Sequence, residues 1–358
     1  MKVEFLKTAD RAVGPFVIRL LKKPVGFQLL SPKSILIIRP GGIGDAVLLI
    51  PSILAIKKKY PAAAIDVLAE KRNCGVFSLC LEIRDVYLYD RPKEFWKAIR
   101  NGYDVVIDTE QSHRMSAVVA RLTKALVIIG YATNERKKMF THQAPYFHDD
   151  YEAESFLHLI EPVVGKVDFD PDKPFLSIPY LTDKANSCLT QLSGGGEIVA
   201  IFPGGSIPER RWGAERFRKV AMELVGNGYG VVVVGGKEDV ADGEAISEDI
   251  TGAINLCGML SILETAAVLK EATLLITGDS GIMHIGYALG VQTLALFGPG
   301  IERKWAPRGH NCVIINKHLD CSPCTKFGYT PQCSKNVECM ALITVEEVYG
   351  KAIELLKR

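Results

Sequence analysis

The chain has 358 residues, of which 48% are hydrophobic and 23% charged, a globular composition with enough length for about two domains. Its 43 basic and 41 acidic residues leave a formal net charge of +2, which excludes a global positive field for holding nucleic acid. No run of about 18 apolar residues and no secretory cleavage pattern is found. We therefore expect a cytoplasmic protein.

An amphipathic segment lies near the N-terminus, where apolar residues such as Phe16 and Leu20 alternate with Arg19 and Lys22 before Pro24. A segment of this kind can rest on a membrane surface with its basic side among the headgroups. It more often packs on its own protein. Peripheral contact with a membrane therefore stays open beside a purely cytoplasmic location.

Short apolar runs alternate with stretches of helical periodicity along the first half, the pattern of a parallel sheet covered by helices. A glycine-rich turn separates the first expected strand, Ile35 to Ile38, from a helix expected over Ala46 to Tyr60. The further strands expected in this half are Ile65 to Leu68, Val86 to Tyr89, Val105 to Ile107 and Val127 to Ile129.

A proline-rich stretch from about Gly165 to Pro179 is poor material for a helix or a central strand, and we place the domain boundary there. The two domains are then residues 1–175 and 176–358. The second half repeats the alternation, and Val345 to Leu356 predicts a last helix that could pack on either half. Its expected strands are Ile198 to Phe202, Val231 to Val234, Ile254 to Leu256, Leu274 to Thr277 and Thr293 to Phe297. The predicted class is α/β, with two Rossmann-like, doubly wound domains facing each other across a cleft.

Three glycine-rich turns directly follow strands, and in open α/β sheets ligands bind beyond the carboxyl ends of the strands. The turns are Pro40 to Asp45, Pro203 to Ser206 and Thr277 to Gly281. The first is not a dinucleotide-binding fingerprint, because Leu49 stands where the G-x-G-x-x-G pattern requires its third glycine.

The second and third turns carry the features of an anion site. Ser280 and Gly281 open a helix whose free backbone N–H groups would hold a phosphate, although a plain N-cap by Asp279 or Ser280 explains the pattern equally well. Arg210 and Arg211 follow the second turn, and arginine forks match phosphate oxygens. A solvated arginine pair is the alternative for that run.

The first turn offers Asp45 at a helix start. Its carboxylate could act as a general base. Alternatively, it is an acidic residue that favours the helix dipole and has no chemical role.

Together these segments resemble the bacterial lipopolysaccharide heptosyltransferases, glycosyltransferase family 9, along the chain from about Ser34 to Leu356. The resemblance rests on the order and spacing of IRPGGIGDAVLLIPSI, FPGGSIPERRWGAERF, TGDSGIMHIGYALG and LFGPGIERKWAPRG. It implies the GT-B fold and transfer of heptose, with inversion and without a metal ion or other cofactor, from ADP-L-glycero-D-manno-heptose to the lipid-linked lipopolysaccharide inner core.

The resemblance also implies roles for residues. Asp45 would deprotonate the acceptor hydroxyl, and Arg210, where the family usually has lysine, would neutralise the leaving ADP, although Arg211 could share that task. Glu238 or Asp239 would face the ribose. The full set expected at the donor is Gly204, Gly205, Ser206, Arg211, Glu238, Asp239, Asp279, Ser280, Gly281 and His284.

The first domain should hold the acceptor. Its candidate residues are Gly44 beside Asp45, and His113 and Arg114 after the strand that ends at Asp108. A solvated basic helix face is the alternative interpretation of the latter two.

Nine cysteines include a late group, Cys321, Cys324, Cys333 and Cys339. Four thiolates could hold a structural zinc, but the second tight pair typical of such sites is missing, so disulfides or free thiols are equally credible. Because the group follows the last motif, we expect it to be structural and far from the donor.

Two other functions remain open at this stage. The first is a transferase of the same fold that uses another nucleotide sugar. The second is a non-catalytic relative that only binds a nucleotide or a glycan.

Overall fold

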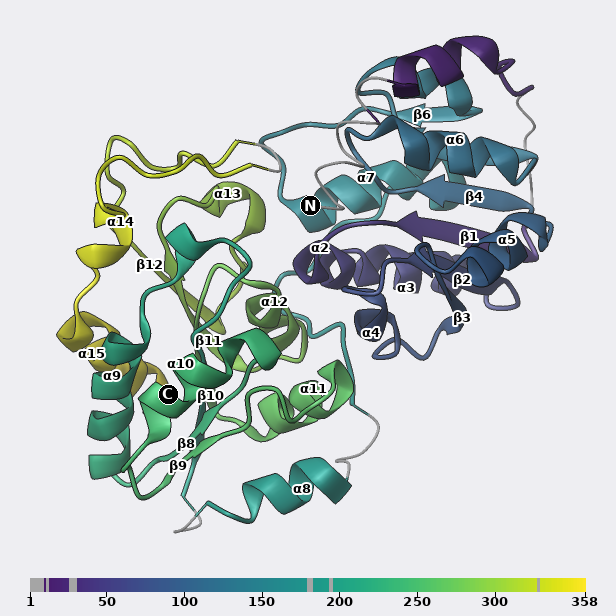
Figure 1. Ribbon diagram of the computed structural model, residues 1–358. Helices are drawn as coiled ribbons and strands as arrows, with labels where there is room; N and C mark the ends of the chain where they lie inside the picture. Colours follow the sequence, from purple (N-terminus) through teal and green to yellow (C-terminus); the bar gives the residue numbers. More distant parts are fainter. Residues whose placement is uncertain (1–9, 11–12, 26–30, 179–182, 193–195, 327–328) are drawn as a thin grey trace. The chain divides into compact units, whose positions relative to one another are not determined.

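A computed structural model describes the chain except for residues 1–9, 11–12, 26–30, 179–182, 193–195 and 327–328 (Figure 1). Pro179, the end of the predicted boundary segment, therefore lies outside the described residues. The chain divides into two compact units, Met1–Phe169 and Asp170–Arg358.

The first unit is built on a parallel six-stranded sheet in the order β3-β2-β1-β4-β5-β6. Its central strands are short apolar runs buried on both faces, as parallel strands between two helical layers must be. The strands are β1 Ser34–Arg39, β2 Ala64–Ala69, β3 Ile83–Leu88, β4 Val105–Asp108, β5 Val127–Tyr131 and β6 His142–Ala144.

Helices cover both faces of this sheet (Figure 1). They are α2 Ile43–Leu48, α3 Ile50–Lys59, α4 Cys74–Phe77, α5 Pro92–Arg100, α6 Arg114–Leu122, the 3-10 helix η1 Glu135–Met139 and α7 Glu152–Val164. Side chains of α5, α6 and η1 pack in one cluster with Leu36 and Ile38 of β1. The alternate residues Ile35 and Ile37 are also fully buried, so they face the layer on the other side.

The amphipathic N-terminal segment is helical over residues 13–20. Ile18 is buried in the same cluster as α5 and α6, which confirms that one side packs on its own protein. Lys138 donates to the carbonyl oxygens of Ile18 and Arg19, at 3.3 and 3.1 Å, and anchors the helix. Phe16 and Leu20 on the other side are 63% and 71% exposed.

The helix predicted over Ala46 to Tyr60 is two helices, α2 and α3, that meet at Leu49. Pro51 stands in the first turn of α3 and has no N–H to continue the hydrogen-bond ladder of α2, so the helix ends and starts again. The break leaves α2 as a short helix that begins in the glycine turn and carries Asp45 in its first turn.

The second unit has the same arrangement, a parallel sheet in the order β12-β11-β10-β7-β8-β9. The strands are β7 Ile198–Phe202, β8 Gly230–Val233, β9 Ala253–Asn255, β10 Leu274–Gly278, β11 Gln292–Phe297 and β12 Cys312–Asn316. The edge strands β6 and β12 lie outside the predicted set, and both are only partly buried, so their side chains alternate less clearly than those of central strands.

The helices of the second unit include the predicted last helix with its predicted bounds, α15 Val345–Leu356. The others are α8 Asp183–Leu189, η2 Pro208–Arg210, α9 Ala214–Gly226, η3 Lys237–Asp239, α10 Val240–Ser247, α11 Ile262–Glu271, α12 Gly281–Ala288, α13 Glu302–Trp305 and α14 Glu338–Ala341. Val348, Ala352 and Leu355 of α15 join the core of this unit together with Phe217 of α9. The last helix therefore packs on the second half of the chain.

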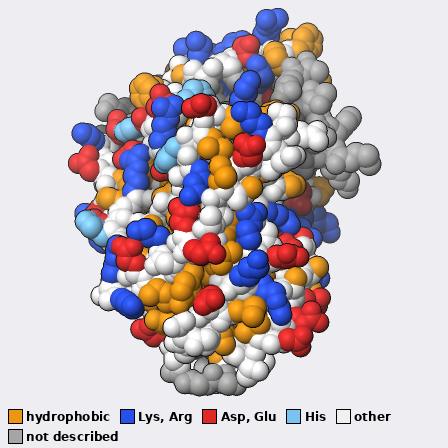
Figure 2. Space-filling view, turned by 90° about the vertical axis from the view of Figure 1, so that its left-hand side faces the viewer, with side chains coloured by type: hydrophobic (Ala, Val, Ile, Leu, Met, Phe, Trp, Pro, Cys, Tyr) orange, Lys and Arg blue, Asp and Glu red, His pale blue; other side chains and the backbone are white. Residues whose placement is uncertain are grey.

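None of the described helices is both long enough and apolar enough to cross a membrane. Figure 2 shows basic and acidic side chains interspersed over the face turned to the viewer, in agreement with the small net charge.

Candidate functional site

The chain order reverses within each sheet, and such a switch point opens a crevice at the carboxyl ends of the strands. In the second unit β7 pairs with β10. The strands that follow them in the chain, β8 and β11, lie on opposite sides of this pair. The glycine turns Pro203 to Ser206 and Thr277 to Gly281 follow β7 and β10. The sheet therefore brings the second and third predicted turns to one edge.

Arg210 joins the two turns electrostatically. Its Nη1 lies 2.7 Å from Oδ2 of Asp279, and both side chains are largely buried. Its Nε is buried and has no hydrogen-bond partner in the structure. Gly278 has no room for a side chain, because a Cβ there would lie 2.9 Å from the Arg210 carbonyl oxygen. The pair is thus a close-packed feature with a donor left to be satisfied.

Arg211 has a different environment, made by its own loop. Its Nε donates to the Gly205 carbonyl oxygen at 2.9 Å, and its other nitrogens lie 3.4 Å from Asp242 and 3.9 Å from Asp239. These contacts hold the glycine turn in shape. The two adjacent arginines therefore differ, since Arg210 faces the third turn and Arg211 secures the second.

The start of α12 combines both interpretations of the third turn. The Ser280 hydroxyl accepts the Met283 N–H at 3.2 Å and so serves as the N-cap. Asp279, immediately before it, pairs with Arg210. The first backbone N–H groups of α12, from Gly281 on, stand at the positive end of the helix beside a guanidinium. An anion would be stabilised by both.

His284 lies on the first turns of α12 and is 3% exposed. Burial, and secondarily the nearby charge of Arg210, lowers its pKa from 6.5 to about 3. Its Nδ1 is buried without a hydrogen-bond partner. The imidazole is therefore neutral at physiological pH and has one ring nitrogen free to bond a ligand.

Glu238 and Asp239, the two candidates for binding the ribose, differ in exposure and in their contacts within the chain. Asp239 is buried, accepts the Gly236 N–H at 2.9 Å and lies against Gly204, where a Cβ would be 2.2 Å from its Oδ1. Burial raises its pKa. Asp239 thus braces two glycine turns, and Glu238 is exposed.

In the first unit the switch point lies between β1 and β4, and the central feature there is an ion pair. Nη2 of Arg39 stands 3.3 Å from Oδ2 of Asp45, while Nη1 donates to the Thr109 carbonyl oxygen at 3.0 Å. The guanidinium also lies 5.5 Å from the ring centre of Phe156. A Cβ on Gly41, whose φ is +118°, would be 2.7 Å from Arg39 Nη2, so the turn needs glycine.

Burial opposes the charge on Arg39, but the carboxylates of Asp45, Glu110 and Glu152 outweigh it and raise its pKa. The guanidinium therefore stays charged although it is 2% exposed. Arg39 is the residue that the sequence analysis missed. The sequence pattern that could have indicated it is a charged residue at the end of an apolar strand, directly before the glycine turn.

The acceptor candidates make internal contacts. Arg114 bonds Glu135 through Nε and Nη2, at 2.9 and 2.7 Å, and its backbone N–H donates to Asp10. His113 lies at the start of α6 with Nδ1 3.8 Å from Asp10. Gly44 lies in α2 directly before Asp45 and could contribute only backbone groups. Arg114 is thus largely committed to structural contacts.

The late cysteines are close to Arg210, so the expectation that they lie far from the donor residues is wrong in position. Cys321, Cys324, Cys333 and Cys339 line one cavity of about 150 Å³, and Glu209 lines it as well. All four are free thiols. The loop between β12 and α14 lies next to η2, since Thr325 Oγ1 is 3.5 Å from Arg210 Nη2. Within the part of the chain that the structure describes, no three His, Cys, Asp or Glu side chains are grouped so as to hold a metal ion.

Known proteins resemble this chain along most of its length. The model of glycosyltransferase family 9 (heptosyltransferase) matches residues 93–334. Lipopolysaccharide heptosyltransferase 3 of Escherichia coli K12 is 28% identical over 337 residues, covering 87% of this chain and 95% of the relative. Lipooligosaccharide heptosyltransferase 2 of Haemophilus influenzae is 26% identical over 308 residues, with 79% and 88% covered.

Among solved structures, E. coli ADP-heptose lps heptosyltransferase II aligns with a TM-score of 0.74 at 21% identity. The alignment covers 90% of this chain and 98% of that one. A likeness at this identity shows the fold, and it confirms the predicted class of two Rossmann-like α/β units of the GT-B type.

Proposed function

This chain belongs to glycosyltransferase family 9 (heptosyltransferase), and from that membership we propose that it transfers heptose from ADP-L-glycero-D-manno-heptose to the lipopolysaccharide inner core, with inversion. The names of the relatives support the donor and the acceptor, since they are lipopolysaccharide or lipooligosaccharide heptosyltransferases and one carries ADP-heptose in its name.

The donor side is assigned to the second unit, and the observation that carries it is the buried Arg210 with its unsatisfied Nε. Arg210 and the N-terminus of α12 supply positive charge where a diphosphate gains negative charge as the sugar bond breaks. Neutral His284 would bond the phosphate or the sugar, and exposed Glu238 would accept from the ribose hydroxyls. With this charge supplied by the chain, the transfer needs no metal ion.

The acceptor side is assigned to the first unit, with Asp45 as general base. Inverting displacement requires the acceptor oxygen to lose a proton as it attacks the anomeric carbon from the face opposite the leaving ADP. Asp45 takes that proton, and Arg39 holds its carboxylate in place. The backbone of Gly44 and the side chain of His113 border the acceptor, and Arg114 contributes mainly by fixing α6.

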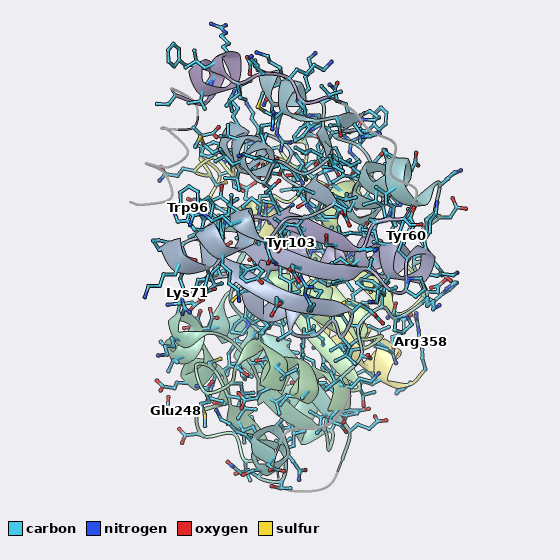
Figure 3. The ribbon with its side chains drawn as sticks, turned by 90° about the vertical axis from the view of Figure 1, so that its right-hand side faces the viewer. Tyr60, Lys71, Trp96, Tyr103, Glu248 and Arg358 are labelled. Carbon is cyan, nitrogen blue, oxygen red and sulfur yellow. The ribbon has the colours of Figure 1, made fainter. Side chains whose placement is uncertain are left out.

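A lipid-linked acceptor favours peripheral contact with the inner membrane through the first unit. Phe16 and Leu20 project from the N-terminal helix, and basic residues accompany them. α5 belongs to the same helical layer and carries Trp96, 48% exposed, among Lys93, Lys97 and Arg100. Figure 3 shows Trp96 at the outer side of α5, whereas Tyr103, after α5, is buried against the sheet. Apolar anchors with basic neighbours suit an anionic lipid surface.

Calorimetric titration with ADP, UDP and GDP tests the donor assignment. We expect ADP to bind most tightly, and Arg210→Ala to weaken its binding. Equal or tighter binding of UDP or GDP would instead favour a transferase that uses another nucleotide sugar.

Turnover tests the activity itself. ADP should be released from ADP-heptose only when a core acceptor is present, and NMR of the product should show the inverted anomeric configuration. Tight ADP binding without any acceptor-dependent release would identify a non-catalytic binding protein.

A further inference from the structure

The cavity lined by the four late cysteines has no assigned purpose in the reaction. Two acidic residues, Glu209 of η2 and Glu338 of α14, and one basic residue, Lys335, border it as well. Four thiols around one space of about 150 Å³ are the ligand set that a thiophilic metal ion such as Zn²⁺ takes.

The segment that carries three of these cysteines, residues 317–337, lacks a core. Its described residues form no helix or strand beyond a bridge between Lys326 and Tyr329. Thr325 is the only buried side chain among them. Long loops without secondary structure are uncommon in compact domains, and segments that cannot bury apolar surface are usually held by disulfides or a metal ion.

The backbone after Cys333 is shaped around its sulfur. The N–H groups of Lys335 and Val337 point at Cys333 Sγ, at 3.4 and 3.3 Å. Val337 adopts φ 54° and ψ 41°, a left-handed conformation that is unfavourable for a β-branched residue. Two N–H groups directed at one sulfur fix the position of the Cys333 side chain in the cavity wall.

The same loop touches Arg210. Thr325, next to Cys324, lies with Oγ1 3.5 Å from Arg210 Nη2, and its N–H donates to the Pro299 carbonyl oxygen at 3.0 Å. Glu209, in the cavity wall, immediately precedes Arg210. Whatever fixes this loop therefore also fixes the surroundings of Arg210.

We propose that Cys321, Cys324, Cys333 and Cys339 bind one thiophilic divalent ion such as Zn²⁺, and that this ion fixes Thr325 behind Arg210. Binding releases the four thiol protons and forms four metal–sulfur bonds, with no oxidant involved. Among the described residues, no three His, Cys, Asp or Glu side chains are placed to hold a metal ion. The four sulfurs must therefore turn inward when the ion enters. Only the role of Thr325 rests on the proposed donor function.

The metal site is tested by titrating chelator-stripped, reduced full-length protein with Co²⁺ under argon. We expect thiolate-to-cobalt charge-transfer absorption that saturates at one ion per chain and is abolished by Zn²⁺. Cys324→Ser and Cys333→Ser should lose it, whereas Cys74→Ser, outside the group, should keep it. No saturable absorption in the wild type, or unchanged absorption in Cys333→Ser, would overturn the site, and this readout needs neither nucleotide nor sugar.

The link to Arg210 is tested by hydrogen–deuterium exchange with and without Zn²⁺. Zn²⁺ should slow exchange in residues 317–337 and also in residues 206–211. Thr325→Val should retain the first effect and lose the second, and Thr325→Ser, which keeps the hydroxyl, should restore it. Protection confined to residues 317–337 in the wild type would show that the ion does not act on Arg210.

Discussion

The guanidinium of Arg39 and the carboxylate of Asp45 stand 3.3 Å apart at the carboxyl end of β1. Arg39 is almost completely buried, while Asp45 is partly exposed. The buried guanidinium of Arg39 therefore holds the Asp45 carboxylate in place while that carboxylate stays partly accessible to solvent. This arrangement suits a group that must stay in one place and accept a proton.

Arg39→Met should leave Asp45 without its partner and cost about 1.5 to 3 kcal/mol of stability, the range for hydrogen bonds of charged groups. Turnover should fall while ADP affinity is kept, because the change lies in the first unit. Thermal unfolding, kcat and ADP titration on one preparation measure all three. Arg39→Lys should restore part of kcat, and a variant with wild-type kcat would show that Arg39 does not position Asp45.

Asp45→Asn keeps the side-chain size and the helix start but removes the basic oxygen. Turnover should fall by about 10²- to 10⁴-fold, the usual contribution of general-base catalysis, with ADP affinity nearly unchanged. If Asp45 serves only the helix dipole, the variant would lose at most about 1 kcal/mol of stability. A stable variant with normal turnover would therefore exclude the base.

Arg210→Ala should weaken ADP binding and slow transfer, at a cost of about 2 to 4 kcal/mol in the transition state, by analogy with loss of an oxyanion donor. Arg211→Ala should act differently, because its contact with the Gly205 carbonyl oxygen is structural. We expect a lower melting temperature with a smaller kinetic effect. The assignments must be exchanged if Arg211→Ala is the variant with the larger kinetic defect.

His284 makes stability depend on pH in a definite direction. Its pKa is about 3 in the folded chain and 6.5 ordinarily, so only the unfolded chain takes up its proton between these values. This contribution is complete above pH 6.5 and falls by about 1.4 kcal/mol per pH unit below it. Urea unfolding at pH 6.5 and 5 should show a loss about 2 kcal/mol larger in the wild type than in His284→Gln. Exposed His318→Gln is the control, and equal losses in all three proteins would contradict neutral burial.

Membrane contact is tested by sedimentation with vesicles. The wild type should bind vesicles that contain phosphatidylglycerol better than neutral ones, and less at high salt. Phe16→Glu or Leu20→Glu should weaken this binding at least about tenfold, because burying such a side chain is worth about 1.5 to 3 kcal/mol. Met222→Glu, on the exposed side of α9, is the matched control. Equal binding by all variants would remove the N-terminal helix from the contact.

Central strands and the last helix could be predicted from the sequence, since continuous apolar runs and a regular 3.6-residue period are strong local signals. The break at Leu49 depends on Pro51, whose effect is local but was outweighed by the apolar periodicity around it. The three glycine turns were found because they directly follow strands. That Arg210 meets Asp279 depends on which strands are neighbours, which no local pattern contains.

Roles within a turn were harder to predict than its position. Asp239 resembles a ligand-facing acid in sequence, yet it is buried as a brace for two turns. The cysteine group resembles an appendage after the last motif, yet the chain returns to η2. In both cases long-range packing decides which polar group is left facing outward.

The packing of α15 against α9 determines which truncations this chain tolerates. Trp212 Nε1 donates to the Ile343 carbonyl oxygen at 3.0 Å, and Val348, Ala352 and Leu355 complete the core around it. A stop codon placed before Thr344 would remove the apolar face of α15 from the core of the second unit and yield an insoluble product. Arg358, just beyond the helix, is exposed, so a substitution there should leave this packing intact.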